Sequence, residues 1–78
     1  MQCFFVQIKT KLGRAYGVAD ALAQREVASE IYSTSGEYDL LAKFYVEDEV
    51  DIGHFVAEHL HYLDGIERTF TTLTFKAF

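Results

Sequence analysis

Histidines are the first residues of this chain whose spacing could support chemistry. His59 and His61 lie two positions apart, so on a helix their side chains point roughly 200° apart and cannot share a metal ion. His54 and Glu58 stand four positions apart, which suits a pair of metal ligands, but no third ligand accompanies them. We therefore expect no metal at these residues.

His59 differs from the other histidines because it falls within an apolar stripe at helical period. The members of the stripe are Ile52, Phe55, Val56, His59, Leu60 and Leu63. Two interpretations of His59 remain open. It is either a core side chain with one hydrogen-bond partner, or it borders a pocket beneath the helix, where an imidazole could bind a carboxylate or respond to pH.

Two polar stretches offer further candidate binding groups. The stretch Ser35–Asp39, SGEYD, is either a tight turn shaped by Gly36 and Asp39, or a binding loop with exposed amides and a carboxylate that can pair with an amino group. The run Thr69–Thr74, TFTTLT, either reflects β-propensity or supplies hydroxyls to a polar ligand at a subunit boundary. The residues by themselves leave both pairs of interpretations open.

Other catalytic patterns are missing from the sequence. The serines and threonines that could act as nucleophiles fall on strand-like runs, and none can be paired with a base. The loop Gly13–Gly17, GRAYG, lacks the glycine pattern and the lysine of a phosphate-binding loop. We therefore expect no enzyme activity and no cofactor.

Composition bounds the size of the domain and points to association. With 78 residues, we expect a single domain over residues 1–78, which buries only about 60–65% of the surface that its unfolded chain exposes. Cys3 is the only cysteine, so no internal disulfide can compensate, and we expect it to fill apolar space. Half of the residues are apolar, with seven Phe and five Tyr among the aromatics. So much apolar surface favours self-association.

Charge and hydropathy exclude two kinds of partner. The net charge is −5 and the basic residues are scattered among the acids, so we expect no direct nucleic-acid binding, which requires clustered Lys and Arg. No apolar run approaches the ~18 residues of a membrane span, so we expect no membrane insertion. The N-terminal MQCFFVQIK has neither the basic start nor the long apolar core of a signal peptide. These features together predict a cytoplasmic location.

Hydrophobic periodicity predicts the elements that position these groups. Alternation predicts strands over Cys3–Thr10, Val27–Ser35, Asp39–Val46 and Glu67–Phe78. Helical spacing predicts a helix over Val18–Glu26 and a clearer one within Asp48–Ile66, with Asp48 as its cap and Gly65 as its left-handed stop. The order β-α-β-β-α-β predicts an α+β, ferredoxin-like fold, in which two helices cover one face of a four-stranded antiparallel sheet.

The other face of that sheet would expose Phe, Tyr and Leu to water in a monomer. The strand Asp39–Val46 carries apolar groups on both faces and therefore needs cover on both sides. A second copy, laid sheet against sheet, supplies this cover. We therefore expect a two-fold homodimer with the architecture of a dimeric α/β barrel.

Three motifs in order resemble one known family. They are Ser35–Gly36–Glu37–Tyr38–Asp39, Leu63–Asp64–Gly65–Ile66 and Thr69–Phe70–Thr71–Thr72. With the order of elements, they resemble the C-terminal effector-binding (RAM) domain of the leucine-responsive and asparagine regulators, the Lrp/AsnC family, over essentially all 78 residues. At Asp64 the family more often has proline. Full regulators add an N-terminal helix-turn-helix, whereas here a predicted strand follows Met1 at once, so a stand-alone effector domain is expected.

The resemblance implies a function and a set of binding residues. It implies a transcription-regulating domain that binds small effectors, commonly amino acids, between dimers that associate into rings such as octamers or decamers. Co-assembly with a full-length regulator is a further hypothesis. The matching effector-responsive residues are Gly36, Glu37, Tyr38, Asp39, His59, Thr71, Thr72 and Thr74. At the position of His59 the family often has a small polar residue.

An enzyme of the same architecture is the alternative interpretation. A small monooxygenase or isomerase on a dimeric α/β barrel would place His59 with Tyr32 or Tyr45 in an enclosed pocket within one subunit. An effector domain would instead place Tyr38 and Asp39 at a groove between subunits. The two interpretations therefore differ in which side chains the fold must bring together.

Overall fold

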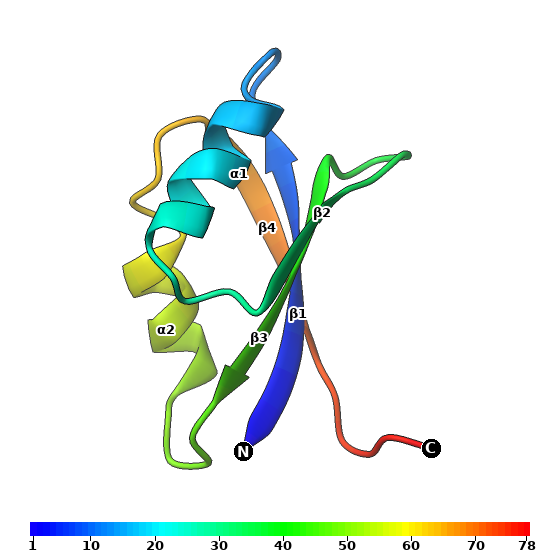
Figure 1. The fold of residues 1–78 in the computed structure, drawn as a ribbon, viewed down its shortest axis with the longest axis vertical. Coiled ribbons are helices and arrows are strands. Elements are labelled where there is room, and N and C mark those ends of the chain that lie inside the picture. The colour runs from blue at the N-terminus through cyan, green and yellow to red at the C-terminus, as the bar shows by residue number, and fades with distance from the viewer.

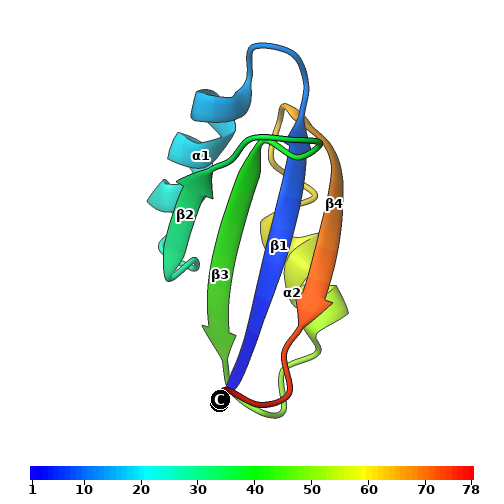
Figure 2. The ribbon, with the colours of Figure 1, turned by 90° about the vertical axis from the view of Figure 1, so that its right-hand side faces the viewer.

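The computed structural model describes residues 1–78 and confirms the predicted order of elements (Figure 1). Two helices lie on one side of a single twisted sheet, and the other side of the sheet is open (Figures 1 and 2). The elements are β1 (Gln2–Thr10), α1 (Ala15–Gln24), β2 (Glu30–Ser33), β3 (Leu40–Val46), α2 (Ile52–His59) and β4 (Ile66–Leu73). This is the ferredoxin-like α+β fold that the sequence predicts.

The sheet is fully antiparallel, with strand order β2-β3-β1-β4. β1 is central and pairs with β3 on one side, where Val6 lies opposite Ala42. On the other side β1 pairs with β4, where Val6 lies opposite Thr71 and Gln7 opposite Phe70. Because successive strand residues point to opposite faces, this register fixes which side chains share each face.

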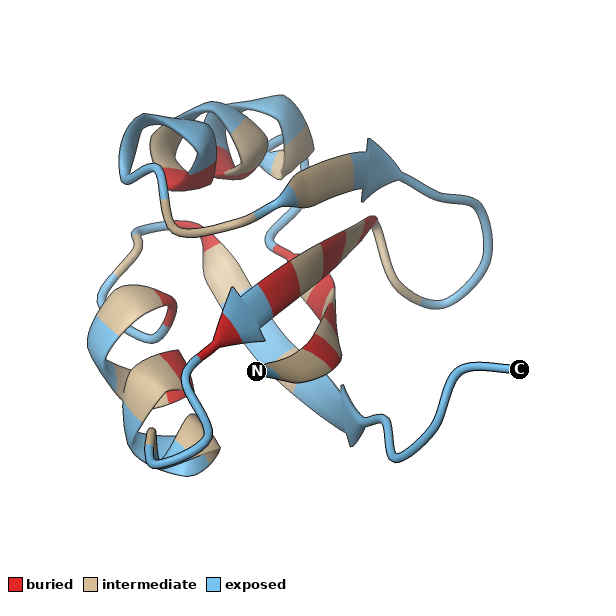
Figure 3. Cartoon of the chain, turned by 60° about the horizontal axis from the view of Figure 1, so that its bottom comes forward, coloured by how far each residue is buried: buried red, intermediate tan, exposed pale blue.

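The core lies between the helices and the sheet. Alternate residues of β1 and β3 are buried there (Figure 3), as the period of two predicts. The ring of Phe4 stacks on that of Phe44, with centroids 5.0 Å apart, and Phe55 of α2 packs edge-on against both rings. Val18 and Leu22 of α1 are also fully buried. The helices therefore cover β1 and β3 on this face, whereas Thr71 and Leu73 of β4 remain exposed on it.

The ends of α1 and β2 differ from the prediction. α1 begins at Ala15, three residues before the predicted Val18. The prediction missed this start because Tyr16 and Gly17 are exposed and carry no apolar periodicity. Glu26 was predicted as helical, but its φ of 57° ends the helical path. β2 covers only Glu30–Ser33 of the predicted Val27–Ser35, because residues 27–29 belong to the connection from α1 and the residues after Ser33 form the loop to β3.

The predicted cap of α2 and the predicted end of β4 were also wrong. Asp51, and not Asp48, caps α2, since its carboxylate accepts a hydrogen bond from the His54 N–H at 3.0 Å. β4 ends at Leu73, opposite Phe4, because β1 has almost no residues left to pair beyond that point. Neither helix has the length and apolar character needed to cross a bilayer.

Gly65 has the predicted left-handed backbone, but it does not end α2 as predicted, because the helix stops at His59; Gly65 instead carries the tight turn that leads into β4. Its φ is +95°, and a Cβ there would lie 3.0 Å from Val18 Cγ2. Its carbonyl accepts a hydrogen bond from the Lys11 N–H at 2.8 Å. The turn therefore holds the start of β4 against the loop that follows β1.

Candidate functional site

The loop between β2 and β3 is closed by hydrogen bonds at both ends. The Thr34 N–H donates to the Asp39 carbonyl at 2.9 Å, and the Thr34 hydroxyl donates to the Tyr38 carbonyl at 3.0 Å. The Asp39 N–H donates to the carbonyl of Ile8, on the central strand, at 2.9 Å. Gly36, with a φ of +95°, makes the reversal between these ends. The loop is thus held in one shape over the open face.

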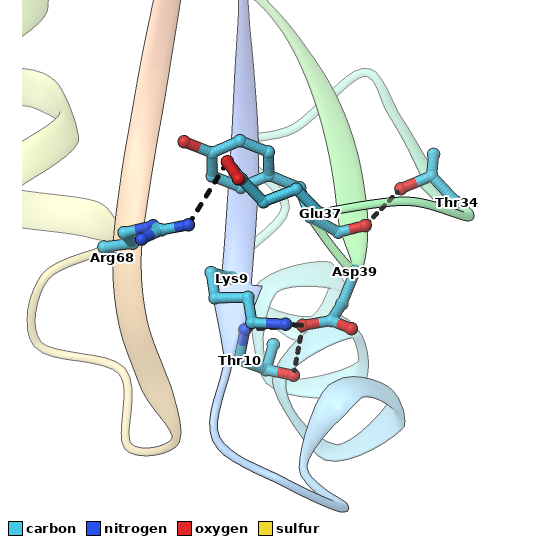
Figure 4. A network of polar contacts seen from close by, with 7 residues as sticks. Lys9, Thr10, Thr34, Glu37, Asp39 and Arg68 are labelled. Atoms are coloured by element: carbon cyan, nitrogen blue, oxygen red, sulfur yellow. Dashed lines mark hydrogen bonds and ion pairs between the residues drawn. The ribbon is translucent and has the colours of Figure 1, made fainter.

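This loop extends across β1 toward β4 (Figures 2 and 4). Its tip contacts Arg68 of β4, where the guanidinium lies 3.3 Å from the Glu37 carboxylate and 5.3 Å from the centre of the Tyr38 ring. The Tyr38 ring also lies 6.4 Å from that of Phe70. The loop therefore contacts the edge strand β4 across the face that the helices leave open.

Asp39 is bound to β1 through one of its carboxylate oxygens. Oδ2 accepts the Thr10 N–H at 2.9 Å and the Thr10 hydroxyl at 3.1 Å, and it lies 3.8 Å from Lys9 Nζ (Figure 4). These hydrogen bonds, first the one from the Thr10 N–H, hold the pKa of Asp39 below its usual value. Oδ1 makes no hydrogen bond or ion pair with the chain. Asp39 thus shapes the fold and keeps one oxygen free.

Four consecutive backbone N–H groups of the loop also lack a partner. Of the N–H groups from Thr34 to Asp39, only those of Thr34 and Asp39 donate a hydrogen bond. The N–H groups of residues 35–38 therefore make no hydrogen bond with the chain. Neighbouring N–H groups around a positive-φ glycine are a common anion-binding arrangement. The loop can therefore accept an anionic group at its backbone and a cationic group at Asp39.

Not all of the predicted site residues lie near this loop in one chain. Gly36, Glu37, Tyr38 and Asp39 form the loop itself. Thr72 lies on the open face opposite Phe5, and Thr74 donates its hydroxyl to the Cys3 carbonyl at 2.6 Å. The fold thus groups the loop and part of β4 on the open side of the sheet.

His59 and Thr71 lie on the helix side of the sheet. Thr71 is opposite Val6 and shares its face. The His59 ring packs against Phe55 at 4.4 Å, and Arg25 donates to its Nδ1 at 2.9 Å. Because a guanidinium can only donate, Nδ1 accepts and the proton of the neutral ring is on Nε2. This contact fits the core-histidine interpretation of His59.

The same arrangement separates the groups that the enzyme interpretation requires. Tyr32 and Tyr45 lie on the open face, opposite Leu41 and Cys3, whereas His59 lies in the helix layer. The surface has two open hollows, of about 290 and 560 Å³, and His59 lines neither. The smaller hollow is bordered by Asp39, Lys9 and Glu67. No three His, Cys, Asp or Glu side chains meet in a way that could hold a metal.

Three residues that contact the predicted site were not anticipated from the sequence. Thr10 binds Asp39, Arg68 binds Glu37, and Arg25 binds His59. The alternation of β4 does place Arg68 on the same face as Phe70 and Thr72. What the sequence lacks is any sign that the β2–β3 loop crosses β1 to reach it.

The sequence and the fold both match known proteins. A family model described as the Lrp/AsnC ligand binding domain matches residues 3–78. The HTH-type transcriptional regulator FL11 from Pyrococcus abyssi is 31% identical over 72 residues, which make up 92% of this chain and 47% of that protein. This chain therefore spans about half the length of the curated relatives that it matches.

Two solved structures illustrate the similarity in fold. TTHA0845 from Thermus thermophilus superposes with a TM-score of 0.90 at 33% identity, covering 100% of this chain and 98% of that one. The transcriptional regulator NMB0573 from Neisseria meningitidis, solved as a complex with L-Met, superposes with a TM-score of 0.82 at 18% identity. That match covers 96% of this chain and 50% of the regulator, and it shows a shared fold alone.

Proposed function

This chain belongs to the Lrp/AsnC family through its ligand-binding domain, and we propose that it is a non-enzymatic regulatory domain that senses an amino acid. The relatives matched by sequence are transcriptional regulators, which supports a regulatory role. NMB0573, a regulator of the same fold, was solved with L-Met, so amino acids are the first ligands to test. The domain acts in the cytoplasm, where its effector is available.

The proposed site uses the two free groups of the β2–β3 loop. The unpaired N–H groups of residues 35–38 hold the α-carboxylate of the ligand, and Asp39 Oδ1 accepts the α-ammonium. The observation that carries this proposal is their adjacency in the chain, since the run of free donors at residues 35–38 is followed directly by Asp39, a carboxylate with one unused oxygen. A zwitterion presents the complementary pair of charges.

The ligand side chain is proposed to lie between subunits. The open face carries Phe5, Leu41, Tyr45 and Phe70 and is the surface on which a second copy would pack. Dimers then associate into rings, in which the ligand is contacted from different subunits by Tyr38, His59, Thr71, Thr72 and Thr74. An effector changes the assembly only if it binds the assembly states with unequal affinity.

A thermal-shift screen of the twenty amino acids, with native mass measurement in parallel, tests the proposal. A ligand at one hundred times its Kd stabilises the folded state by about 2.7 kcal/mol. The amide and the N-acetyl derivative of the amino acid that binds then test the two halves of the site. We expect each derivative to lose the shift, because each removes one of the charges that the loop recognises. Retention of the shift by both derivatives, or no shift with any amino acid at millimolar concentration, would contradict the proposed site.

The Asp39→Asn variant tests the acidic half from the protein side. Asparagine keeps an oxygen that can accept from Thr10, so the loop can retain its shape while the charge is lost. We expect weaker binding of the amino acid in isothermal titration. Asp64→Asn is the matched control, because Asp64 is also an ion-paired acid, bound to Arg14 at 3.0 Å and outside the loop.

A further inference from the structure

Two cations lie side by side on the open face where the β2–β3 loop crosses it. Lys9 of β1 is the register partner of Arg68 of β4. The Cα atoms of such partners are about 4.5–5.5 Å apart, and like charges in this position repel each other. Nearby acids that neutralise the pair relieve this repulsion.

The loop supplies one acid to each cation. Asp39 lies 3.8 Å from Lys9 Nζ, and Glu37 lies 3.3 Å from the Arg68 guanidinium (Figure 4). The two acids are held differently. Asp39 also accepts two hydrogen bonds from Thr10, whereas the Glu37 carboxylate has no other partner and its side chain is 69% exposed. Glu37 is therefore the acid that can leave at little cost.

Arg68 retains unused donor capacity at this position. Its guanidinium carries five N–H donors, and its one close oxygen is that of Glu37. The guanidinium carbon also lies 5.3 Å from the centre of the Tyr38 ring, within the range of a cation–π contact. Glu37 also belongs to the run of free backbone N–H groups at residues 35–38. An anion in the place of the Glu37 carboxylate would thus meet a planar guanidinium beside free amide donors.

We propose that Arg68 is a carboxylate-binding residue of the effector site, and that Glu37 is an internal carboxylate that occupies it in the unliganded chain. The inference rests on the proposed function, since the carboxylate in question is that of the amino acid. Binding exchanges one carboxylate for another at Arg68, and the released Glu37 turns to solvent. Lys9 and Arg68 stay neutralised in both states.

The test compares the ligand affinities of two variants, each of which removes one partner of the ion pair between Glu37 and Arg68. Glu37→Gln and Arg68→Gln both remove this ion pair, so a merely structural pair would change ligand affinity in the same direction in both variants. If Arg68 binds the ligand and Glu37 competes with it, the two substitutions change ligand affinity in opposite directions. We expect Arg68→Gln to weaken affinity about tenfold or more, and Glu37→Gln to strengthen it by about 1.5- to 5-fold. Arg68→Lys keeps the charge without the planar fork and should fall between Arg68→Gln and the wild type.

Isothermal titration at low salt measures these affinities for each of the twenty amino acids, with wild type and Glu37→Gln first. Arg14→Gln and Asp64→Asn are the matched controls, because they break a comparable exposed ion pair outside the loop. Their affinities should equal that of the wild type. If Arg68→Gln does not fold, Arg68→Lys and Glu37→Gln still decide the matter.

The possible failures are distinguishable. Binding by the wild type that is unchanged in Arg68→Gln, or weakened in both variants of the pair, overturns this inference and leaves the proposed function standing. An absence of binding to both wild type and Glu37→Gln overturns the two together. Binding to Glu37→Gln alone supports the inference, since it shows that the internal carboxylate excludes the ligand.

Discussion

The two faces of the sheet are built from the same four strands and differ in almost every other respect. On the helix side, Phe4, Val6, Ile8, Ala42 and Phe44 have no exposed surface. On the open side, Phe5, Leu41, Tyr45 and Phe70 alternate with charged residues. There Lys43 lies 3.4 Å from Glu30 and 5.1 Å from the centre of the Tyr45 ring.

This difference separates stability from recognition. The helix side is apolar along β1 and β3, because the helices of the same chain cover these strands. The open side must remain compatible with water before a partner or ligand arrives, so its aromatic rings share the surface with ion pairs. Stability therefore comes mainly from the helix side, and the β2–β3 loop with its candidate binding groups lies on the other.

The largest expected effect comes from placing a carboxylate at neighbouring positions of β3. Ala42→Asp puts an unpaired charge into the core, and we expect no folded protein by circular dichroism. Leu41→Asp faces the open side and should keep the native spectrum, while it reduces self-association in sedimentation velocity. A folded Ala42→Asp protein, or an unfolded Leu41→Asp protein, would refute the assignment of the two faces.

A second comparison uses one phenylalanine from each face. Phe44 is fully buried, so Phe44→Ala should lower the free energy of unfolding by about 3–5 kcal/mol in urea titrations. Phe70 is 55% exposed, so Phe70→Ala should cost less than about 1.5 kcal/mol. If a second copy covers Phe70, the cost of Phe70→Ala rises with protein concentration, whereas that of Phe44→Ala should not show this rise. Equal costs at every concentration would remove the distinction.

The smallest expected effect is a pH dependence of the free energy of unfolding that arises from carboxyl groups on the open side. Hydrogen bonds from Thr10 lower the folded-state pKa of Asp39. A lowered pKa contributes stability above the unfolded-state value, and this contribution is lost as pH falls through the folded-state value. We therefore expect the unfolding free energy to decline below about pH 4.

Asp39→Asn should flatten that decline, because asparagine does not titrate. Glu30 makes a second contribution of the same sign. Its pKa is also lowered, mainly because it accepts a hydrogen bond from the Tyr32 hydroxyl. Urea titrations between pH 2 and pH 7 measure both effects. A decline in Asp39→Asn as steep as in the wild type would show that Asp39 does not carry this dependence.

The elements could be predicted well from the sequence, and their ends less well. The period of two in Phe4, Val6 and Ile8 indicates a strand and its buried face without any structure. The first turn of α1 gave no such signal, because Tyr16 and its neighbours are exposed. The cap of α2 was misplaced because Asp48 and Asp51 are both acceptable caps, and only the path of the chain selects Asp51.

The loop of the candidate site was predicted from the sequence, but the residues that contact the loop were not. Gly36 and Asp39 are residues with recognisable turn chemistry, so the SGEYD stretch was visible in the sequence. Thr10 and Arg68 have no such local pattern. Thr10 joins the site through hydrogen bonds to Asp39, 29 residues away, and Arg68 joins it through its ion pair with Glu37 of the β2–β3 loop.

The sequence by itself determined the element types and the side chains that share each strand face, because both follow from local periodicity. It also indicated that one face of the sheet needs a partner. Only the tertiary structure decided that the β2–β3 loop crosses β1 and brings Glu37 to Arg68 and Asp39 to Thr10. Strand order, register and loop path depend on contacts between distant residues, and no local pattern encodes which distant residue will be the partner.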